Sequence, residues 1–129
     1  MVVVLFVCTG NAARSQMAEG WLKNLKSELE VLSAGTKPEG VSKKAIKVME
    51  EVGIDISNHS SDYLEDVEWK KADYAITLCD SANESCVFMP WPEKCERMHW
   101  PIKDPESENE FRSARDEIKQ KITVFLSEF

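Results

Sequence analysis

The sequence predicts an α/β fold in which helices flank a central parallel sheet. Short runs of β-branched and aromatic residues, typical of strands buried on both faces, alternate with longer segments whose apolar residues recur at helical spacing. Two of these runs are followed directly by a cysteine, Cys8 and Cys79. Ligands of such folds bind beyond the carboxyl ends of the strands. Both cysteines are therefore candidate site residues.

The first half of the chain is predicted to alternate two strands with two helices, at residues 2–7, 15–25, 30–33 and 42–52. The first strand is a continuous apolar run, and the second is closed by the pair Ala34-Gly35. The second helix has Ser42 as its N-cap and Gly53 just past its end. The first helix places its apolar residues at spacings of three and four: Met17, Ala18, Trp21, Leu22 and Leu25.

The second half is predicted to contain a capped helix start, two strands and a long helix, at residues 60–62, 74–78, 96–100 and from 108 onward. The polar segments 80–85 and 104–109 are predicted to be loops. Because no linker separates the elements, residues 1–129 are expected to form one domain. The last helix should span about five turns behind a single apolar stripe, formed by Phe111, Ala114, Ile118, Ile122 and Phe125.

The composition argues against several classes of protein. Of the residues, 43% are hydrophobic and 30% are charged, and no apolar run is long enough to cross a bilayer. A net charge of −7 disfavours binding to nucleic acid or to an anionic membrane, since both require a basic patch. The apolar start follows Met1 with no basic residue before it, unlike a signal peptide, so a cytoplasmic location is expected. The 4 cysteines are then more often catalytic or metal-binding than structural.

The turn between the first strand and the first helix carries a candidate oxyanion site. Its small residues allow successive backbone N–H groups to point at one centre, and the helix adds its positive end. Arg14 offers a planar fork to two oxygens of a tetrahedral oxyanion, and the same surroundings favour the thiolate of Cys8 as a nucleophile. The alternative is that Cys8 is a buried hydrophobe and Arg14 a surface charge. The predicted oxyanion-binding loop comprises Thr9, Gly10, Asn11, Ala12, Ala13, Arg14 and Ser15.

This turn resembles the loop and first helix shared by the low-molecular-weight tyrosine phosphatases and the thioredoxin-coupled arsenate reductases of the same superfamily. The matching run is V-C-T-G-N-A-A-R-S-Q-M-A-E-G-W at residues 7–21. The resemblance implies the fold of that superfamily for the whole chain, with Asn11 and Ser15 bracing the loop by hydrogen bonds. It continues, in order, through S-A-G at 33–35, I-D-I-S-N-H-S-S-D at 54–62, T-L-C at 77–79, H-W at 99–100 and D-P at 104–105.

The pair Cys79 and Cys86 distinguishes the two branches. In the arsenate reductases that the chain resembles, a cysteine pair at this spacing after the same strand resolves the reaction by disulfide exchange, whereas the phosphatases have no need of one. The alternatives are two unrelated cysteines, or a zinc site at a spacing longer than usual. Further zinc ligands would have to come from Cys95, His59 or His99. Cys95 is otherwise a spare thiol or a backup resolving cysteine.

Two departures from the phosphatases also favour the reductase branch. Glu106 and Ser107 follow the Asp104-Pro105 pair, where phosphatases generally carry an aromatic that holds the phosphotyrosine ring. Ala13 stands where a second loop cysteine often occurs, although some of the resembling reductases also carry a cysteine there.

The resemblance implies a thiol relay that reduces arsenate to arsenite. Cys8 attacks arsenate while Asp104 acts as general acid, Cys79 then forms a disulfide with Cys8, and Cys86 moves the disulfide to Cys79–Cys86. Thioredoxin or a similar dithiol protein reduces this disulfide, and phosphate or sulfate would compete with arsenate. The alternative function is a low-molecular-weight tyrosine phosphatase or small phosphomonoesterase using Cys8, Arg14 and Asp104. A non-catalytic redox or oxyanion-binding module is the third possibility.

Some of the resembling reductases also bind potassium near the loop. The matching positions all carry oxygen atoms, which suit a hard cation, but a helix cap at residues 60–62 and an exposed helix carboxylate would use the same side chains. No tightly bound cofactor and a monomeric chain are expected. The candidate potassium ligands are Asn11, Glu19, Ser33, Ser60 and Asp62.

Overall fold

A four-stranded parallel sheet in the order β2-β1-β3-β4 forms the centre of the computed structural model, which describes residues 1–87 and 89–129. The strands are β1 (Val3–Cys8), β2 (Glu30–Gly35), β3 (Tyr74–Thr77) and β4 (Glu96–His99). The helices are α1 (Arg14–Leu25), α2 (Lys43–Glu50), α3 (Asp80–Cys86) and α4 (Glu108–Ser127), with short 3-10 turns η1 (Leu64–Asp66) and η2 (Trp69–Lys71). The predicted α/β class is confirmed.

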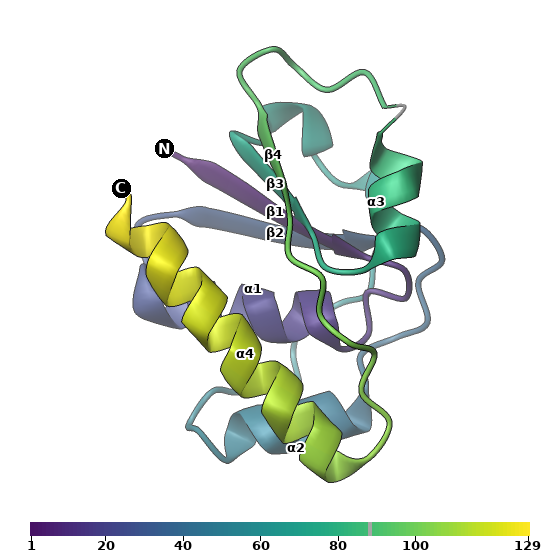
Figure 1. Ribbon diagram of the computed structural model, residues 1–129, viewed down its shortest axis with the longest axis vertical. Helices are drawn as coiled ribbons and strands as arrows, with labels where there is room; N and C mark the ends of the chain where they lie inside the picture. The colour runs from purple at the N-terminus through teal and green to yellow at the C-terminus, as the bar shows by residue number, and fades with distance from the viewer. Residues whose placement is uncertain (88) are drawn as a thin grey trace.

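The helices cover both faces of the sheet, as Figure 1 shows: α1, α2 and α4 lie on one side and α3 lies on the other. All six residues of β1 are buried, which explains why this strand reads as one continuous apolar run. Because the strands are parallel, their carboxyl ends share one edge of the sheet. The connection from β1 to α1 and the start of α3 meet at this edge, and both chain ends lie toward the opposite edge (Figure 1).

The C-terminal helix behaves as predicted. Its apolar stripe is buried against the rest of the core, and Ser107 caps its start in a reciprocal capping box with Glu110. Ser42 likewise caps α2, since its Oγ accepts a hydrogen bond from the backbone N–H of Ala45 at 3.3 Å. Gly53 follows α2 with a φ of 81°, a conformation that glycine adopts without strain.

The prediction of a loop between Cys79 and Cys86 was wrong, because this segment forms α3. Cys79 is the N-cap of the helix, and its Sγ accepts a hydrogen bond from the backbone N–H of Ala82 at 3.4 Å. Asp80 lies in the first turn, where a carboxylate interacts favourably with the positive end of the helix. The single apolar residue inside the polar run, Ala82, is fully buried. Ala82 and Cys86, four residues apart, give the helix a buried face that the polar run does not reveal.

The predicted helix cap at residues 60–62 was also wrong. The Oγ of Ser60 donates to Asp62 Oδ2 at 2.8 Å, and the Oγ of Ser61 donates to the carbonyl oxygen of Gly10 at 3.1 Å. These side chains are thus engaged with one another and with the loop after β1. The turn that follows is η1, whose N-cap is Tyr63.

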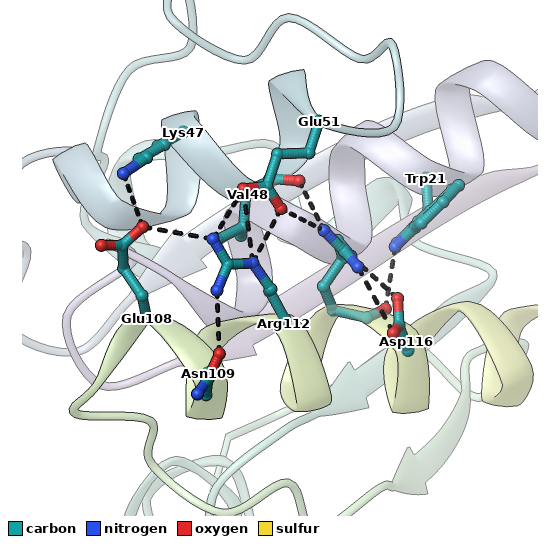
Figure 2. Close-up of polar contacts among 9 residues, drawn as sticks. Trp21, Lys47, Val48, Glu51, Glu108, Asn109, Arg112 and Asp116 are labelled. Carbon is teal, nitrogen blue, oxygen red and sulfur yellow. Dashed lines mark hydrogen bonds and ion pairs between the residues drawn. The ribbon is translucent and has the colours of Figure 1, made fainter.

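A network of charged side chains joins α2 to α4 (Figure 2). Arg112 Nη2 donates to Glu51 Oε2 at 2.8 Å, and Arg115 Nη1 donates to Glu51 Oε1 at 3.0 Å. Arg115 is buried, and it also donates to the carbonyl oxygen of Val48 at 2.9 Å. Hydrogen bonds from these guanidinium groups, that of Arg112 first, lower the pKa of Glu51 from 4.5 to about 2.

Glu51→Gln is expected to lower the free energy of unfolding at neutral pH and to weaken its acid dependence. The pKa of Glu51 is depressed in the folded state, so its stabilising contribution is complete above pH 4.5 and is lost as the pH falls toward about 2. Urea unfolding at pH 7, 4.5 and 3 should show a steeper acid loss in the parent than in the variant. Glu117→Gln, on an exposed carboxylate of α4, is the matched control. Equal acid slopes in parent and Glu51→Gln would contradict the assignment.

Candidate active site

The loop between β1 and α1 folds into a tight cradle at the carboxyl edge of the sheet. Asn11 has a φ of 46°, in the left-handed region that asparagine tolerates better than most residues. Gly35, at the end of β2, lies directly behind the loop. A Cβ at this position would lie 2.6 Å from the carbonyl oxygen of Thr9 and 2.8 Å from the backbone nitrogen of Asn11. Glycine in the S-A-G run is therefore required for the close approach of the loop.

Buried polar side chains hold the cradle in shape. Asn11 is fully buried, and its Nδ2 donates to Ser15 Oγ at 2.7 Å and to Ser33 Oγ at 3.0 Å. Its Oδ1 accepts from the backbone N–H of Asp62 at 2.9 Å. Gln16 Nε2 donates to the carbonyl oxygen of Asn11 at 2.9 Å. The loop conformation is thus fixed by groups from α1, β2 and the segment before η1.

Cys8 lies beneath this loop, with 3% of its surface exposed. Its Sγ is 2.9 Å from the Oγ of Ser15. Because Asn11 donates to the same Ser15 oxygen, the hydroxyl proton of Ser15 is available to the sulfur. The start of α1, a helix of 12 residues, adds the positive end of its dipole. These groups suit a nucleophilic thiolate at Cys8.

Arg14 and Asp104 lie together at the mouth of the cradle. Arg14 Nη1 donates to the carbonyl oxygen of Ile102 at 2.8 Å, and its Nη2 lies 3.6 Å from Asp104 Oδ1. The side chain of Asp104 is 78% exposed, whereas that of Arg14 is 14% exposed. Both residues line a cavity of about 260 Å³ together with Cys79. The structure therefore brings three of the five predicted catalytic residues to one cavity.

Cys79 contacts the cradle at the side chain of Thr9. The hydroxyl of Thr9 lies 3.3 Å from the Sγ of Cys79, so the first residue of the loop contacts the second thiol of the predicted relay. The four cysteines are all described and all are free thiols. Cys79 therefore lies beside the oxyanion loop.

Cys86 is held apart from Cys79 by the full length of α3. Seven residues of helix separate the two Cα atoms by about 10 Å along the axis, whereas a disulfide requires a separation below about 7 Å. Burial, with a smaller effect of the charge on Cys79, raises the pKa of Cys86 to about 11. Cys86 is thus a protonated, buried thiol while α3 is folded. While α3 is folded, Cys86 is also too far from Cys79 to form a disulfide with it.

Cys95 lies on the wrong side of the sheet to replace Cys79. It immediately precedes β4, so it is found at the amino edge of the parallel strands, opposite the cradle. The structure therefore gives no support to a backup resolving role. Nor does it support a zinc site, since no three His, Cys, Asp or Glu side chains gather around a metal position within residues 1–87 and 89–129.

Three of the five candidate potassium ligands form one chain of hydrogen bonds. Asn11 donates to Ser33, and Ser33 Oγ donates to Glu19 Oε1 at 2.5 Å. The other carboxylate oxygen of Glu19 pairs with the ammonium group of Lys23. Ser60 and Asp62 pair with one another instead. The oxygen atoms of the set therefore face partners from the protein itself.

One contact near the site had no counterpart in the sequence reasoning. His99, at the end of β4, contacts Asp80 Oδ1 through Nε2 at 2.9 Å and Thr77 Oγ1 through Nδ1 at 2.8 Å. In the sequence, His99 was considered only as a possible zinc ligand, and the H-W pair was otherwise given no role. Only the formation of α3 places Asp80 beside the end of β4, so the contact could not be predicted while this segment was read as a loop.

Comparisons with known proteins agree with this geometry. The model of the family described as Low molecular weight phosphotyrosine protein phosphatase matches residues 3–129. A protein of Staphylococcus saprophyticus named Arsenate reductase 2 is 48% identical over 125 residues, which are 95% of this chain and 94% of the relative.

Solved structures of arsenate reductases have the same fold. One, described as an arsenate reductase in the phosphate binding state, has a TM-score of 0.84 at 36% identity and covers 99% of this chain and 98% of its own. Another, in an oxidized state, has a TM-score of 0.86 at 35% identity with the same coverage. Within residues 1–87 and 89–129, each helix is too short or too polar to span a lipid bilayer.

Proposed function

The chain belongs to the low molecular weight phosphotyrosine protein phosphatase family, and we propose that it is an arsenate reductase whose three thiols act in sequence. The observation that carries the proposal is the position of Cys79. Its sulfur lies 3.3 Å from the hydroxyl of Thr9 in the oxyanion loop, and it lines the same cavity as Arg14. A phosphatase would use Cys8, Arg14 and Asp104 and would leave this second thiol without a role. In an arsenate reductase, Cys79 has a function in addition to those of Cys8, Arg14 and Asp104.

In the first step arsenate binds in the loop after β1, and Cys8 attacks arsenic. Arg14 is oriented by the carbonyl oxygen of Ile102, so its remaining N–H groups face two oxygens of the anion. A sulfur–arsenic bond forms while an arsenic–oxygen bond breaks. Asp104 at the exposed mouth protonates the departing oxygen, which leaves as water. Phosphate and sulfate, which have the same tetrahedral shape and charge, compete for the loop.

In the second step the sulfur of Cys79 attacks the sulfur of Cys8. The sulfur–arsenic bond breaks, and its electron pair passes to arsenic, which changes from arsenic(V) to arsenic(III) and leaves as arsenite. The two cysteines together lose two electrons and form a Cys8–Cys79 disulfide. Phosphate cannot follow this step, because thiols do not reduce phosphorus(V).

In the third step Cys86 attacks Cys79 and releases Cys8 as a thiolate. The new disulfide requires α3 to unwind, since the folded helix separates the two residues by about 10 Å. Unwinding also exposes Cys86, which removes the burial that raises its pKa. The helix therefore keeps the third thiol unreactive until the first disulfide has formed at its other end.

The disulfide on α3 must then be reduced by a dithiol protein of the thioredoxin kind. Four free thiols suit a reducing compartment, which supports a cytoplasmic location. One chain carries every residue of the relay, which supports a monomer as the active unit.

A coupled assay tests the function. Arsenate, thioredoxin, thioredoxin reductase and NADPH are combined with the protein, and NADPH oxidation is followed together with arsenite release. Equal amounts of NADPH consumed and arsenite released over many turnovers are expected, with competitive inhibition by phosphate. Hydrolysis of an aryl phosphate without any arsenate-dependent NADPH oxidation would overturn the proposal in favour of the phosphatase.

We also propose that this chain binds potassium weakly, because Lys23 already supplies the cation at Glu19. A potassium ion would have to displace an ammonium group that is held by a neighbour one turn away on α1. The Asn11 amide also presents its N–H groups, and not its oxygen, to Ser33. These two contacts support the proposal of weak potassium binding.

Lys23→Met is expected to create a dependence on potassium. With the ammonium removed, Glu19 and Ser33 can coordinate a hard cation, and KCl should raise the melting temperature of the variant by about 3 °C over choline chloride of equal ionic strength. The parent should show no such difference. Lys26→Met, at the half-buried C-cap lysine of α1, is the matched control. A potassium-dependent melting temperature in the parent would contradict the proposal.

A further inference from the structure

A tryptophan from the segment after α3 caps the carboxyl end of this helix with a side-chain hydrogen bond. Trp91 Nε1 donates to the carbonyl oxygen of Cys86 at 2.8 Å. The same oxygen accepts the backbone N–H of Met89 at 3.2 Å. Cys86 is the last residue of α3, so its carbonyl is one of those that the helix itself cannot satisfy. An indole N–H is a donor only and fits this place.

The indole ring is itself held in position. Trp91 packs edge-to-face against Trp69 of η2, with ring centroids 5.3 Å apart at an interplanar angle of 80°. Its backbone N–H donates to the carbonyl oxygen of Met89 at 2.9 Å. These contacts hold the indole N–H of Trp91 in position independently of α3. The entropic cost of its hydrogen bond to the Cys86 carbonyl is therefore small.

A cavity lies beside the hydrogen bond between Trp91 and Cys86. This cavity of about 210 Å³ lies between α3, β3 and β4, and Cys86, Val87 and Trp91 are among its lining residues. Val87, the C-cap of α3, is 53% exposed. Cys86 itself is buried, so this end of the helix meets the cavity on one side and solvent on the other.

We propose that Trp91 is a positioning residue that holds Cys86 in the dithiol state and thereby sets the reduction potential of the Cys79–Cys86 pair. This inference rests on the proposed function, in which Cys86 must leave the end of α3 to reach Cys79. The bond from Trp91 to the Cys86 carbonyl exists only while that end of the helix is in place. An interaction present in one of two states shifts the equilibrium between them toward that state.

The direction of the effect follows from the electron balance. Oxidation removes two electrons and two protons from Cys79 and Cys86 and forms one sulfur–sulfur bond. Because Trp91 stabilises the dithiol, it makes the disulfide a stronger oxidant, which is more readily reduced by a dithiol protein. Loss of the indole N–H should make the disulfide harder to reduce.

Trp91→Phe tests the inference, since it keeps an aromatic ring against Trp69 and removes only the donor. Equilibration of the protein with dithiothreitol buffers, read by mass spectrometry of alkylated thiols, gives the potential without arsenate. The equilibrium constant should shift roughly threefold to tenfold toward the disulfide, which corresponds to a potential about 14 to 30 mV more negative.

Trp21→Phe is the matched control. Trp21 Nε1 donates to the carbonyl oxygen of Arg115 at 3.0 Å, so this substitution removes the same kind of bond between α1 and α4, away from the thiols. It should lower the melting temperature and leave the potential unchanged. An unchanged potential in Trp91→Phe, or an equal shift in both variants, would overturn the inference.

The rate of alkylation of Cys86 gives a second measurement on the reduced protein. Release of the helix end should raise this rate in Trp91→Phe by the same threefold to tenfold and leave it unchanged in Trp21→Phe. Neither measurement requires arsenate, so failure of the coupled assay would count against the proposed function and not against the role of Trp91. An alkylation rate equal to that of the parent would count against Trp91 alone.

Discussion

Arg14→Lys is expected to lower kcat/KM for arsenate by about a hundredfold or more, although the positive charge is kept. The guanidinium donates to the carbonyl oxygen of Ile102 at 2.8 Å through one nitrogen and lies 3.6 Å from Asp104 through another. This anchoring leaves a planar pair of N–H groups for two oxygens of the anion. A lysine ammonium is a point charge, and it cannot donate to the Ile102 carbonyl and contact two oxygens of the anion at the same time.

The measurement is steady-state arsenate reduction in the coupled assay, with phosphate inhibition followed in parallel. Both kcat/KM and the affinity for phosphate should fall, because the same fork holds either anion. Arg112→Lys, on the outer network between α2 and α4, is the control for a change of arginine to lysine and should reduce arsenate at the parent rate. Near-parent turnover in Arg14→Lys would mean that this arginine only supports the structure.

The parts of the site that were predictable are those in which local sequence alone determines the geometry. The run from Val3 to Val7 can be read as a buried strand because every residue in it is apolar. The loop that follows must turn tightly before an amphipathic helix, and its small residues allow it. The position of Cys8 and Arg14 at the carboxyl edge of a parallel sheet follows from these two facts.

The parts that were not predictable depend on contacts between distant segments. Nothing in D-S-A-N-E-S reveals that Ala82 is buried against the sheet, so a polar helix was read as a loop. The N-cap of that helix is a cysteine, which is not among the preferred capping residues. The hydrogen bond from Trp91 to Cys86 likewise depends on how the chain folds back after α3. The pairing of Glu19 with Lys23, in contrast, follows the i,i+4 spacing of α1 and could be predicted from the sequence.

These unpredicted contacts change the chemistry assigned to the second cysteine pair. A loop would let Cys79 and Cys86 meet freely, and both thiols could then oxidise without arsenate. A folded helix keeps them about 10 Å apart and keeps Cys86 protonated, since burial raises its pKa to about 11. In the relay that we propose, the structure of α3 therefore sets the order, with the Cys8–Cys79 disulfide formed first.

Cys86→Ser is expected to release one arsenite per protein and then stop, with a Cys8–Cys79 disulfide trapped. The first two thiols are intact, and Thr9 still holds Cys79 at the edge of the loop. Multiple-turnover reduction should fall at least about a hundredfold, because no thiol remains to free Cys8. Disulfide mapping by mass spectrometry after one turnover identifies the trapped pair.

Cys79→Ser is expected to release no arsenite, because Cys95 lies at the opposite edge of the sheet and cannot attack the adduct on Cys8. Both variants should keep any slow hydrolysis of an aryl phosphate, since that reaction needs Cys8, Arg14 and Asp104 but no second thiol. Cys95→Ser is the control and should turn over like the parent. If Cys79→Ser and Cys86→Ser both reduce arsenate at the parent rate with thioredoxin as sole reductant, the three-thiol relay is wrong. Arsenite release from Cys79→Ser that disappears in the Cys79→Ser, Cys95→Ser double variant would instead show that Cys95 reaches the adduct on Cys8.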